Sequence, residues 1–338
     1  MARQWILRRG SKAAGFRYVR ERGAVVRDQR TLERIDRLRI PPAWRDVHIA
    51  ADARSAIQAW GFDARGRRQY RYHDRAVERG TLRKFHRIRQ MAHDLPRIRR
   101  ALHVDARRTG SDRETVAALV LLLIIEGFFR VGGERYVREN RTFGITTLRK
   151  THVGVDGGCI EFDYRGKGRI RQRQVVVDEW LARAVRRLLR TPGARLFRYR
   201  DAEGWHDLTA RDVNEYLRAR LGVRYTAKDF RTWGGTLRLA TVLADIGPGN
   251  SATDAKRNVT LGVRLVAAEL GNTPAICRAS YVHPIVIARY LDDGVTIGIA
   301  SRARVRGGGR FGYAPEERAL IAFLEKFFPE RRKAERED

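Results

Sequence analysis

The first 78 residues or so show short runs of hydrophobic residues that alternate with polar ones. This two-residue period is typical of half-buried β-strands, and it predicts strands over 5–9, 16–20, 47–50, 56–61 and 69–73. One stretch differs, because Leu32, Ile35 and Leu38 recur at helical spacing before Pro41 and Pro42 stop the helix. A turn pattern at 63–66 precedes the last strand.

From about residue 79 the hydrophobic residues recur every three or four positions, which predicts helices. Ser111 and Glu114 have capping-box spacing at the start of a strongly apolar helix that runs to Phe129. Tight turns then join three predicted strands at 153–155, 159–164 and 170–177. The other predicted helices span 81–92, 96–104, 134–140, 178–190, 209–221, 227–246, 251–270, 283–292 and 315–328.

This order of elements predicts an α+β fold with two main parts. A small N-terminal domain of mixed strands and helix would occupy residues 1–78. A larger, mainly α-helical domain with a three-stranded antiparallel sheet would occupy residues 79–306. Residues 307–338 would form a C-terminal helix attached through Gly307–Gly309 and followed by a frayed, charged tail.

The charge of the chain points to a polyanionic partner. Lys and Arg number 70 against 39 Asp and Glu, which gives a net charge of +31. A surface of this sign attracts nucleic acid, although a merely basic, ribosomal-type surface is the plainer alternative. Only eight of the 70 basic residues are Lys. Because Lys can give up a proton where Arg cannot, each Lys is a candidate for proton transfer.

The sequence lacks the signals that mark several other classes of protein. No run of about 18 uncharged apolar residues indicates a membrane span, and the N-terminus lacks the apolar segment of a signal peptide. We therefore expect a cytosolic protein. The two cysteines form no CxxC pair, no histidine spacing suggests a zinc site, and no phosphate-binding Gly-Lys loop occurs. We expect no metal and no cofactor.

Four segments carry residues suited to phosphodiester chemistry without a metal. Guanidinium groups can neutralise a phosphate, a Lys can protonate the leaving oxygen, and a Tyr can act as nucleophile. Taken singly, each segment also has a structural explanation: a capped helix end, a solvated turn, a basic helix start and a packed tyrosine. The segments are 129–136 with Arg130, 165–168 with Lys167, 226–233 with Lys228 and Arg231, and 271–284 with Asn272 and Tyr281.

Taken together, the order of these residues resembles the type IB DNA topoisomerases, in particular their poxvirus and bacterial branch. Lys-Asp-Phe-Arg-Thr-Trp at 228–233 and Ser-Tyr-Val-His-Pro at 280–284 are close to the signature strings of that family. Residues 40–44 and 63–73 look like the N-terminal domain of that branch, so the resemblance covers roughly residues 15–300. Two positions depart from the pattern. Asn272 stands where poxvirus and eukaryotic members carry His, and Gly168 stands where poxvirus members carry Asp.

The resemblance implies a fold, an activity and a set of roles. The fold would be that of type IB topoisomerases and tyrosine recombinases, and the activity would be relaxation of supercoiled DNA without ATP or metal. Tyr281 would form a 3′-phosphotyrosyl link, while Arg130 and Arg231 hold the phosphate oxygens. Lys167 would protonate the leaving 5′ oxygen. Lys228 and Asn272 would assist at the same phosphate.

The resemblance also implies how DNA is held. The N-terminal domain would clamp duplex DNA, and we expect a monomer in the bacterial cytosol or nucleoid with no membrane partner. The residues expected to contact DNA are Arg67, Gln69, Tyr70, Tyr72, Arg135 and Tyr136. For Tyr70 and Tyr72 the alternative is packing in the core of the domain.

Two other functions compete with this interpretation. A tyrosine recombinase uses the same chemistry, but recombinases typically carry His where this chain has Lys228. A non-enzymatic basic DNA-binding protein would explain the charge and would leave the order of Arg, Lys, Arg and Tyr as a coincidence.

Overall fold

The computed structural model describes residues 4–222, 225–299 and 311–328. The chain divides into two compact units, Met1–Phe85 and His86–Asp338. We predicted a boundary after residue 78, and the observed division falls inside a single helix, α2 (Asp74–Ala106). The predicted glycine spacer at 307–309 and the charged tail after residue 328 lie outside the described residues.

The first unit is an antiparallel sheet with a helix packed on one face. Its five strands lie in the order β2-β1-β3-β4-β5, so each prediction of a strand in this region is confirmed. The helix α1 (Gln29–Arg37) starts at Asp28, whose side chain accepts from the Thr31 amide, and it buries Ile35. Ile35 packs with Ile6 and Ile49 of the sheet. The strands are β1 (Trp5–Ser11), β2 (Gly15–Arg20), β3 (Arg45–Ala50), β4 (Ile57–Phe62) and β5 (Arg68–Tyr72).

The prediction of two helices over 81–92 and 96–104 was wrong, because α2 runs through Pro96 without a break. A proline inside a helix removes one backbone hydrogen bond and normally ends or kinks the helix. Here the apolar stripe continues on both sides of the proline, with Met91, Leu95, Ile98 and Leu102 all at 0–1% exposure. Burial of that stripe outweighs the lost hydrogen bond.

The apolar helix α3 (Arg113–Gly127) lies at the centre of the second unit, and its residues 115–124 are buried. Its start differs from the prediction, because Asp112 rather than Ser111 caps it by accepting from the Thr115 amide. The carbonyl of Ser111 instead accepts from the Arg200 amide. The helix ends at Gly127 rather than Phe129, because Phe128 adopts a left-handed conformation with φ of 53°.

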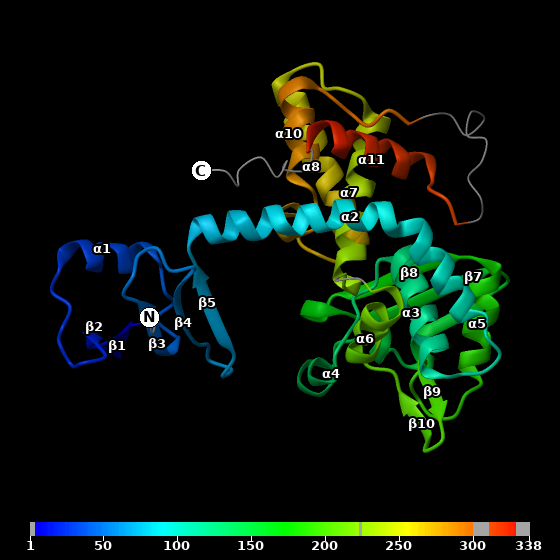
Figure 1. Cartoon of the computed structure of the whole chain (residues 1–338), viewed down its shortest axis with the longest axis horizontal. Coiled ribbons are helices and arrows are strands. Elements are labelled where there is room, and N and C mark those ends of the chain that lie inside the picture. The colour runs from blue at the N-terminus through cyan, green and yellow to red at the C-terminus, as the bar shows by residue number, and fades with distance from the viewer. Residues whose placement is uncertain (1–3, 223–224, 300–310, 329–338) are drawn as a thin grey trace. The chain divides into compact units, whose positions relative to one another are not determined.

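The rest of the second unit combines a small sheet with further helices, as predicted (Figure 1). The three-stranded antiparallel sheet has the order β6-β7-β8. The β9–β10 hairpin and the short helix α9 (Pro274–Ser280) were not predicted from the sequence. The remaining elements are β6 (Val153–Asp156), β7 (Cys159–Arg165), β8 (Arg171–Val177), β9 (Arg198–Asp201), β10 (Gly204–Asp207), α4 (Glu134–Asn140), α5 (Glu179–Leu189), α6 (Ala210–Leu221), α7 (Ala227–Ile246), α8 (Ala252–Glu269), α10 (Pro284–Asp293) and α11 (Pro315–Phe327).

The α+β prediction is therefore confirmed. Within the described ranges, no helix combines the length and the hydrophobicity needed to cross a bilayer.

Candidate active site

Arg130 lies just beyond the end of α3, where the chain leaves the helix. Its backbone carbonyl accepts from the Ile145 amide at 2.7 Å, which fixes this extended segment. Its guanidinium donates to the carbonyl oxygen of Gly271 and to the side-chain oxygen of Asn272, each at 2.6 Å. Arg130 and Asn272, which were both predicted for the site, are thus in direct contact although 142 positions separate them in the sequence.

Arg231 is held on the second turn of α7. The start of this helix is fixed by Asp229, which accepts from the Thr226 amide at 2.8 Å and forms an ion pair with Arg87 at 2.7 Å. Arg231 is only 2% exposed and donates to the Leu270 carbonyl at 2.9 Å. Its guanidinium carbon lies 5.2 Å from the ring centroid of Tyr281. Residues 270–272, between α8 and α9, therefore hold both arginines.

Of the two positively charged guanidinium groups, that of Arg231 is buried and that of Arg130 is half-buried. Burial and the nearby charge of Arg130 lower the pKa of Arg231 to about 10, although a hydrogen bond with Tyr281 opposes the shift. Burial also lowers the pKa of Arg130. At neutral pH both remain protonated. Among the described carboxylates none forms an ion pair with either group, whereas the half-buried Arg99 is paired with Glu317 at 2.7 Å. Such an arrangement stabilises a bound anion.

Tyr281 follows directly after α9 and is held by its backbone. Its amide donates to the Cys277 carbonyl at 2.9 Å, and its carbonyl accepts from the Thr236 hydroxyl at 3.3 Å. The helix α7 comes very close at Gly235, where a Cβ atom would lie 2.9 Å from the Tyr281 carbonyl oxygen. At Gly234 a Cβ would lie 2.0 Å from the ring of Phe128.

The glycine pair allows close packing at the candidate site and was not recognised in the sequence. Two adjacent glycines inside a helix are unfavourable for helix formation and usually mark a close approach. The glycine pair is visible in the sequence, but the sequence does not identify the segments that approach it.

Lys167 lies in the short 3₁₀ turn η3 (Lys167–Arg169) between β7 and β8 and is exposed. Gly168 allows this turn through its positive φ of 74°. The buried Gln172 of β8 packs so closely on Gly271 that a Cβ there would meet its side-chain oxygen at 1.8 Å. Gln172 thereby connects the hairpin, close to its turn, to the 270–272 segment, a role that was not predicted from the sequence.

The structure brings together four of the six predicted catalytic residues. Arg130, Arg231, Asn272 and Tyr281 are linked by the contacts above. Lys228 is exposed on the first turn of α7. Within the part of the chain that the structure describes, no hydrogen bond or ion pair joins Lys167 or Lys228 to those four residues.

Tyr164 of β7 is a further residue that the sequence analysis missed. Its hydroxyl donates to Gln174 at 2.7 Å, and the ring is 5% exposed. Burial raises its pKa to about 12, although the charges of Arg231 and Arg130 act in the opposite direction. It is therefore a neutral phenol beside the two guanidinium groups.

The predicted DNA-contacting residues of the first unit lie on β5 and the turn before it. Tyr70 and Tyr72 are 38% and 51% exposed, and their rings are stacked with centroids 5.8 Å apart. The alternative that they pack in the core is wrong. Gln69 and Arg67 instead donate to Asp63, at 2.9 and 2.8 Å. The hydrogen bonds from Arg67 lower the pKa of Asp63 to about 2.

Tyr70 belongs to a wider aromatic face of the sheet, opposite α1. His48, Trp60 and Tyr70 are direct neighbours across β3, β4 and β5. The His48 and Trp60 rings stack at 4.0 Å, and the guanidinium of Arg68 lies 3.8 Å from the Trp60 ring. The sequence analysis missed His48, Trp60 and Arg68, which the two-residue period places on one face with Tyr70.

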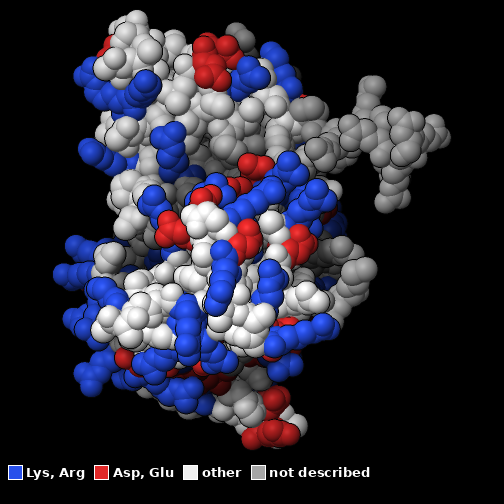
Figure 2. All heavy atoms as spheres, turned by 90° about the vertical axis from the view of Figure 1, so that its left-hand side faces the viewer, with Lys and Arg blue, Asp and Glu red and all other residues white. Residues whose placement is uncertain are grey.

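The other two predicted contacts lie on α4 in the second unit. Tyr136 is 58% exposed, and Arg135 forms an ion pair with Glu139 at 2.7 Å. Lys and Arg side chains occur at many places on the face drawn in Figure 2, whereas Asp and Glu occur in fewer, small groups. This surface fits a polyanionic partner.

Comparison with known proteins gives two family matches and several relatives. Residues 75–293 match a family model described as the catalytic core of eukaryotic DNA topoisomerase I. Residues 15–63 match the N-terminal domain of bacterial DNA topoisomerase IB. The DNA topoisomerase 1B of Acanthamoeba polyphaga mimivirus is 33% identical over 271 residues, which cover 78% of this chain and 80% of the relative. The DNA topoisomerase 1B of vaccinia virus (strain Copenhagen) is 23% identical over 274 residues, covering 78% and 83%.

Proposed function

Because the chain belongs to the type IB DNA topoisomerase family, we propose that Tyr281 is its nucleophile and that Arg130 and Arg231 hold the scissile phosphate. The observation that carries this assignment is a pair of guanidinium groups, the buried Arg231 and the half-buried Arg130, which have no acidic partner among the described residues and of which Arg231 lies next to the Tyr281 ring. Among the described residues their hydrogen-bond partners are two carbonyls, one amide oxygen and the Tyr281 side chain, none of which is a carboxylate, so their charge is available to an anion. A phosphodiester brought to this place would complete the site.

The proposed reaction exchanges one phosphodiester for another. The oxygen of Tyr281 bonds to phosphorus as the bond from phosphorus to the 5′ oxygen breaks. The negative charge that develops on the non-bridging oxygens is stabilised by Arg130 and Arg231, and Asn272 donates a further hydrogen bond through its amide nitrogen. Lys167, on its exposed turn, protonates the leaving oxygen, and Lys228 assists at the same phosphate. The proton released by the phenol balances the one that Lys167 gives up.

Between cleavage and resealing, supercoil energy rotates the free end, so the reaction needs neither ATP nor a metal ion. The substrate we propose is supercoiled duplex DNA, bound by a monomer in the bacterial cytosol. The match to a bacterial N-terminal domain supports this location.

The aromatic face of the first unit is proposed to contact this duplex. Tyr70 and Tyr72 have exposed rings with phenolic hydroxyls, and Arg68 is held against Trp60. These groups can hydrogen-bond to base edges and phosphates. Arg67 and Gln69 would give up their hydrogen bonds to Asp63 and bind DNA instead. Arg135 and Tyr136 would contact DNA from α4.

The test is relaxation of supercoiled plasmid in EDTA without ATP, comparing wild type with Tyr281→Phe. Loss of the hydroxyl should abolish relaxation and the covalent protein–DNA adduct while DNA binding is retained. Tyr199→Phe is the matched control, because it removes the same hydroxyl from a tyrosine of β9 that is not among the proposed site residues. Relaxation by Tyr281→Phe at the wild-type rate would refute the assignment. Strand exchange between two duplexes, without relaxation, would favour the recombinase alternative, and binding alone would favour a passive DNA-binding protein.

A further inference from the structure

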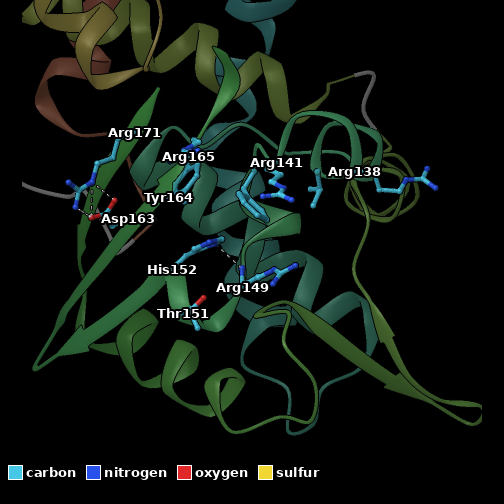
Figure 3. Close-up of a pocket in the computed structure, with 11 residues that line it drawn as sticks. Arg138, Arg141, Arg149, Thr151, His152, Asp163, Tyr164, Arg165 and Arg171 are labelled. Atoms are coloured by element: carbon cyan, nitrogen blue, oxygen red, sulfur yellow. Dashed lines mark hydrogen bonds and ion pairs between the residues drawn. The ribbon is translucent and has the colours of Figure 1, made fainter. Parts of the chain in front are cut away.

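A large basic pocket lies in the second unit beside the proposed catalytic centre. It has a volume of about 880 Å³ and is lined by α4, the segment after it, and the strands β7 and β8 (Figure 3). Pockets that bind small molecules typically have volumes of about 300–1,000 Å³. None of the six proposed catalytic residues lines it.

The lining is strongly and unevenly charged. Five arginines line the pocket against one carboxylate, Asp163. That carboxylate is already used, because Arg171 binds both of its oxygens, with Nε at 2.8 and 3.1 Å. Figure 3 shows the Arg171–Asp163 pair at one side of the labelled pocket residues and the side chain of Arg138 at the opposite side. Within the described residues, no carboxylate forms an ion pair with the other four arginines, which are Arg138, Arg141, Arg149 and Arg165.

His152 adds an oriented donor to this pocket. Its Nδ1 accepts from the Arg149 amide at 3.1 Å, so the proton of the neutral ring is on Nε2. Its ring packs edge-on against Phe143, with centroids 4.5 Å apart. Burial, Arg149 and Arg195 lower the pKa of His152, while Asp163 raises it. The neutral form is therefore favoured in the empty pocket.

The chemistry of this lining selects phosphate groups. Guanidinium groups match phosphate through paired, charge-assisted hydrogen bonds. A single carboxylate or phosphate would leave several of the four charges without a partner, so a ligand with consecutive phosphates fits best. The wall shared with the catalytic centre is Tyr164, whose other neighbours include the charges of Arg130 and Arg231.

We propose that this pocket is a second phosphate-binding site, separate from the catalytic one, which takes a ligand with several linked phosphates. Such a ligand could be a free oligophosphate or the backbone of a nucleic acid. The site goes beyond the proposed strand cleavage, because its binding does not require Tyr281.

The test uses inorganic tripolyphosphate as the probe and calorimetric titration of the full chain. The pocket variant is Arg141→Gln with Arg149→Gln. The control variant is Arg187→Gln with Arg264→Gln, which removes the same charge from exposed positions on α5 and α8. Wild type and control should bind tripolyphosphate at this pocket with similar affinity, and the pocket variant should bind it there at least about tenfold more weakly.

Two further arms complete the experiment. Equal affinities of the pocket and control variants would overturn the proposal, because the anion would then be responding to the overall positive charge. If the double variant fails to fold, Arg165→Gln replaces it, since that side chain is exposed. The titration is then repeated with a short DNA duplex bound. Displacement of tripolyphosphate would support a nucleic-acid backbone as the ligand, and simultaneous binding would support a free oligophosphate.

Discussion

The close approach of α7 to Tyr281 makes Gly235→Ala the most informative substitution. An added Cβ would lie 2.9 Å from the Tyr281 carbonyl oxygen, 3.1 Å from Leu270 Cδ1 and 3.3 Å from Tyr281 Cβ. Ordinary contacts begin near 3.4 Å, so Tyr281 or α7 must move by about half an ångström. The Leu270 carbonyl accepts from Arg231, so the proposed nucleophile Tyr281 and the proposed phosphate-binding Arg231 would both be displaced.

The magnitude follows from how steeply rate depends on geometry. A misplacement of about 1 Å can cost on the order of a hundredfold in rate, so half that displacement predicts roughly tenfold slower strand cleavage. Alanine is favoured over glycine in a helix by about 1 kcal/mol, which offsets part of the strain. The variant should therefore fold and bind DNA while it cleaves slowly.

The assay is single-turnover formation of the covalent adduct on a duplex whose cleaved fragment dissociates. DNA affinity and thermal unfolding are measured on the same proteins. Gly80→Ala is the matched control, because a Cβ at this position of α2 meets no atom within 4 Å. It should cleave at the wild-type rate. A wild-type cleavage rate in Gly235→Ala would refute the idea that this contact positions Tyr281, and equal slowing in Gly80→Ala would point to a general effect on helices.

Three further predictions concern stability and affinity. Glu317→Gln should lower the free energy of unfolding, measured by urea denaturation, by about 3 kcal/mol, because the buried carboxylate accepts two hydrogen bonds from Arg99, at 2.8 and 2.7 Å. The control Glu325→Gln, at an exposed position, should change this free energy by less than about 0.5 kcal/mol. Equal effects of the two substitutions would contradict the role of burial. Burial alone would raise the pKa of Asp105, but hydrogen bonds from Arg220 and Tyr216 lower this pKa below the ordinary value of 3.8. The ionised carboxylate therefore stabilises the folded protein above pH 3.8, and this contribution is lost as the pH falls through the folded-state pKa. Asp105→Asn should therefore flatten the acid limb of stability against pH, and an unchanged limb would disprove this. Finally, the DNA association constant should fall steeply with salt, with a logarithmic slope of about −5 or steeper; a slope near about −2 would mean that few phosphates are contacted.

Much of the fold was determined by local sequence signals. The predicted bounds of α7 agree with the structure, because Thr226 and Asp229 cap its start and its apolar residues keep a helical period. The strands of the five-stranded and the three-stranded sheet follow from their alternation and from glycine turns. These signals involve residues only a few positions apart, and their hydrogen bonds form between neighbours in the chain.

The sequence also supplied the candidate residues for the site, through their order and their resemblance to a family. It could not say which of them meet. Arg130 and Asn272 are in contact although 142 positions separate them, and Arg231 binds a carbonyl 39 positions away. Such pairs depend on how α3, α7 and the 270–272 segment pack.

Only the tertiary structure decided three other features. It kept α2 continuous through Pro96, placed Gly235 against Tyr281, and set Gln172 on Gly271. In each case the conformational preference of the local sequence is neutral or disfavours the observed structure. The outcome depends on surfaces that meet only after the chain has folded. Burial and close packing act between residues that are distant in sequence, so a local signal such as the glycine pair can mark a close approach without identifying the segment that makes it.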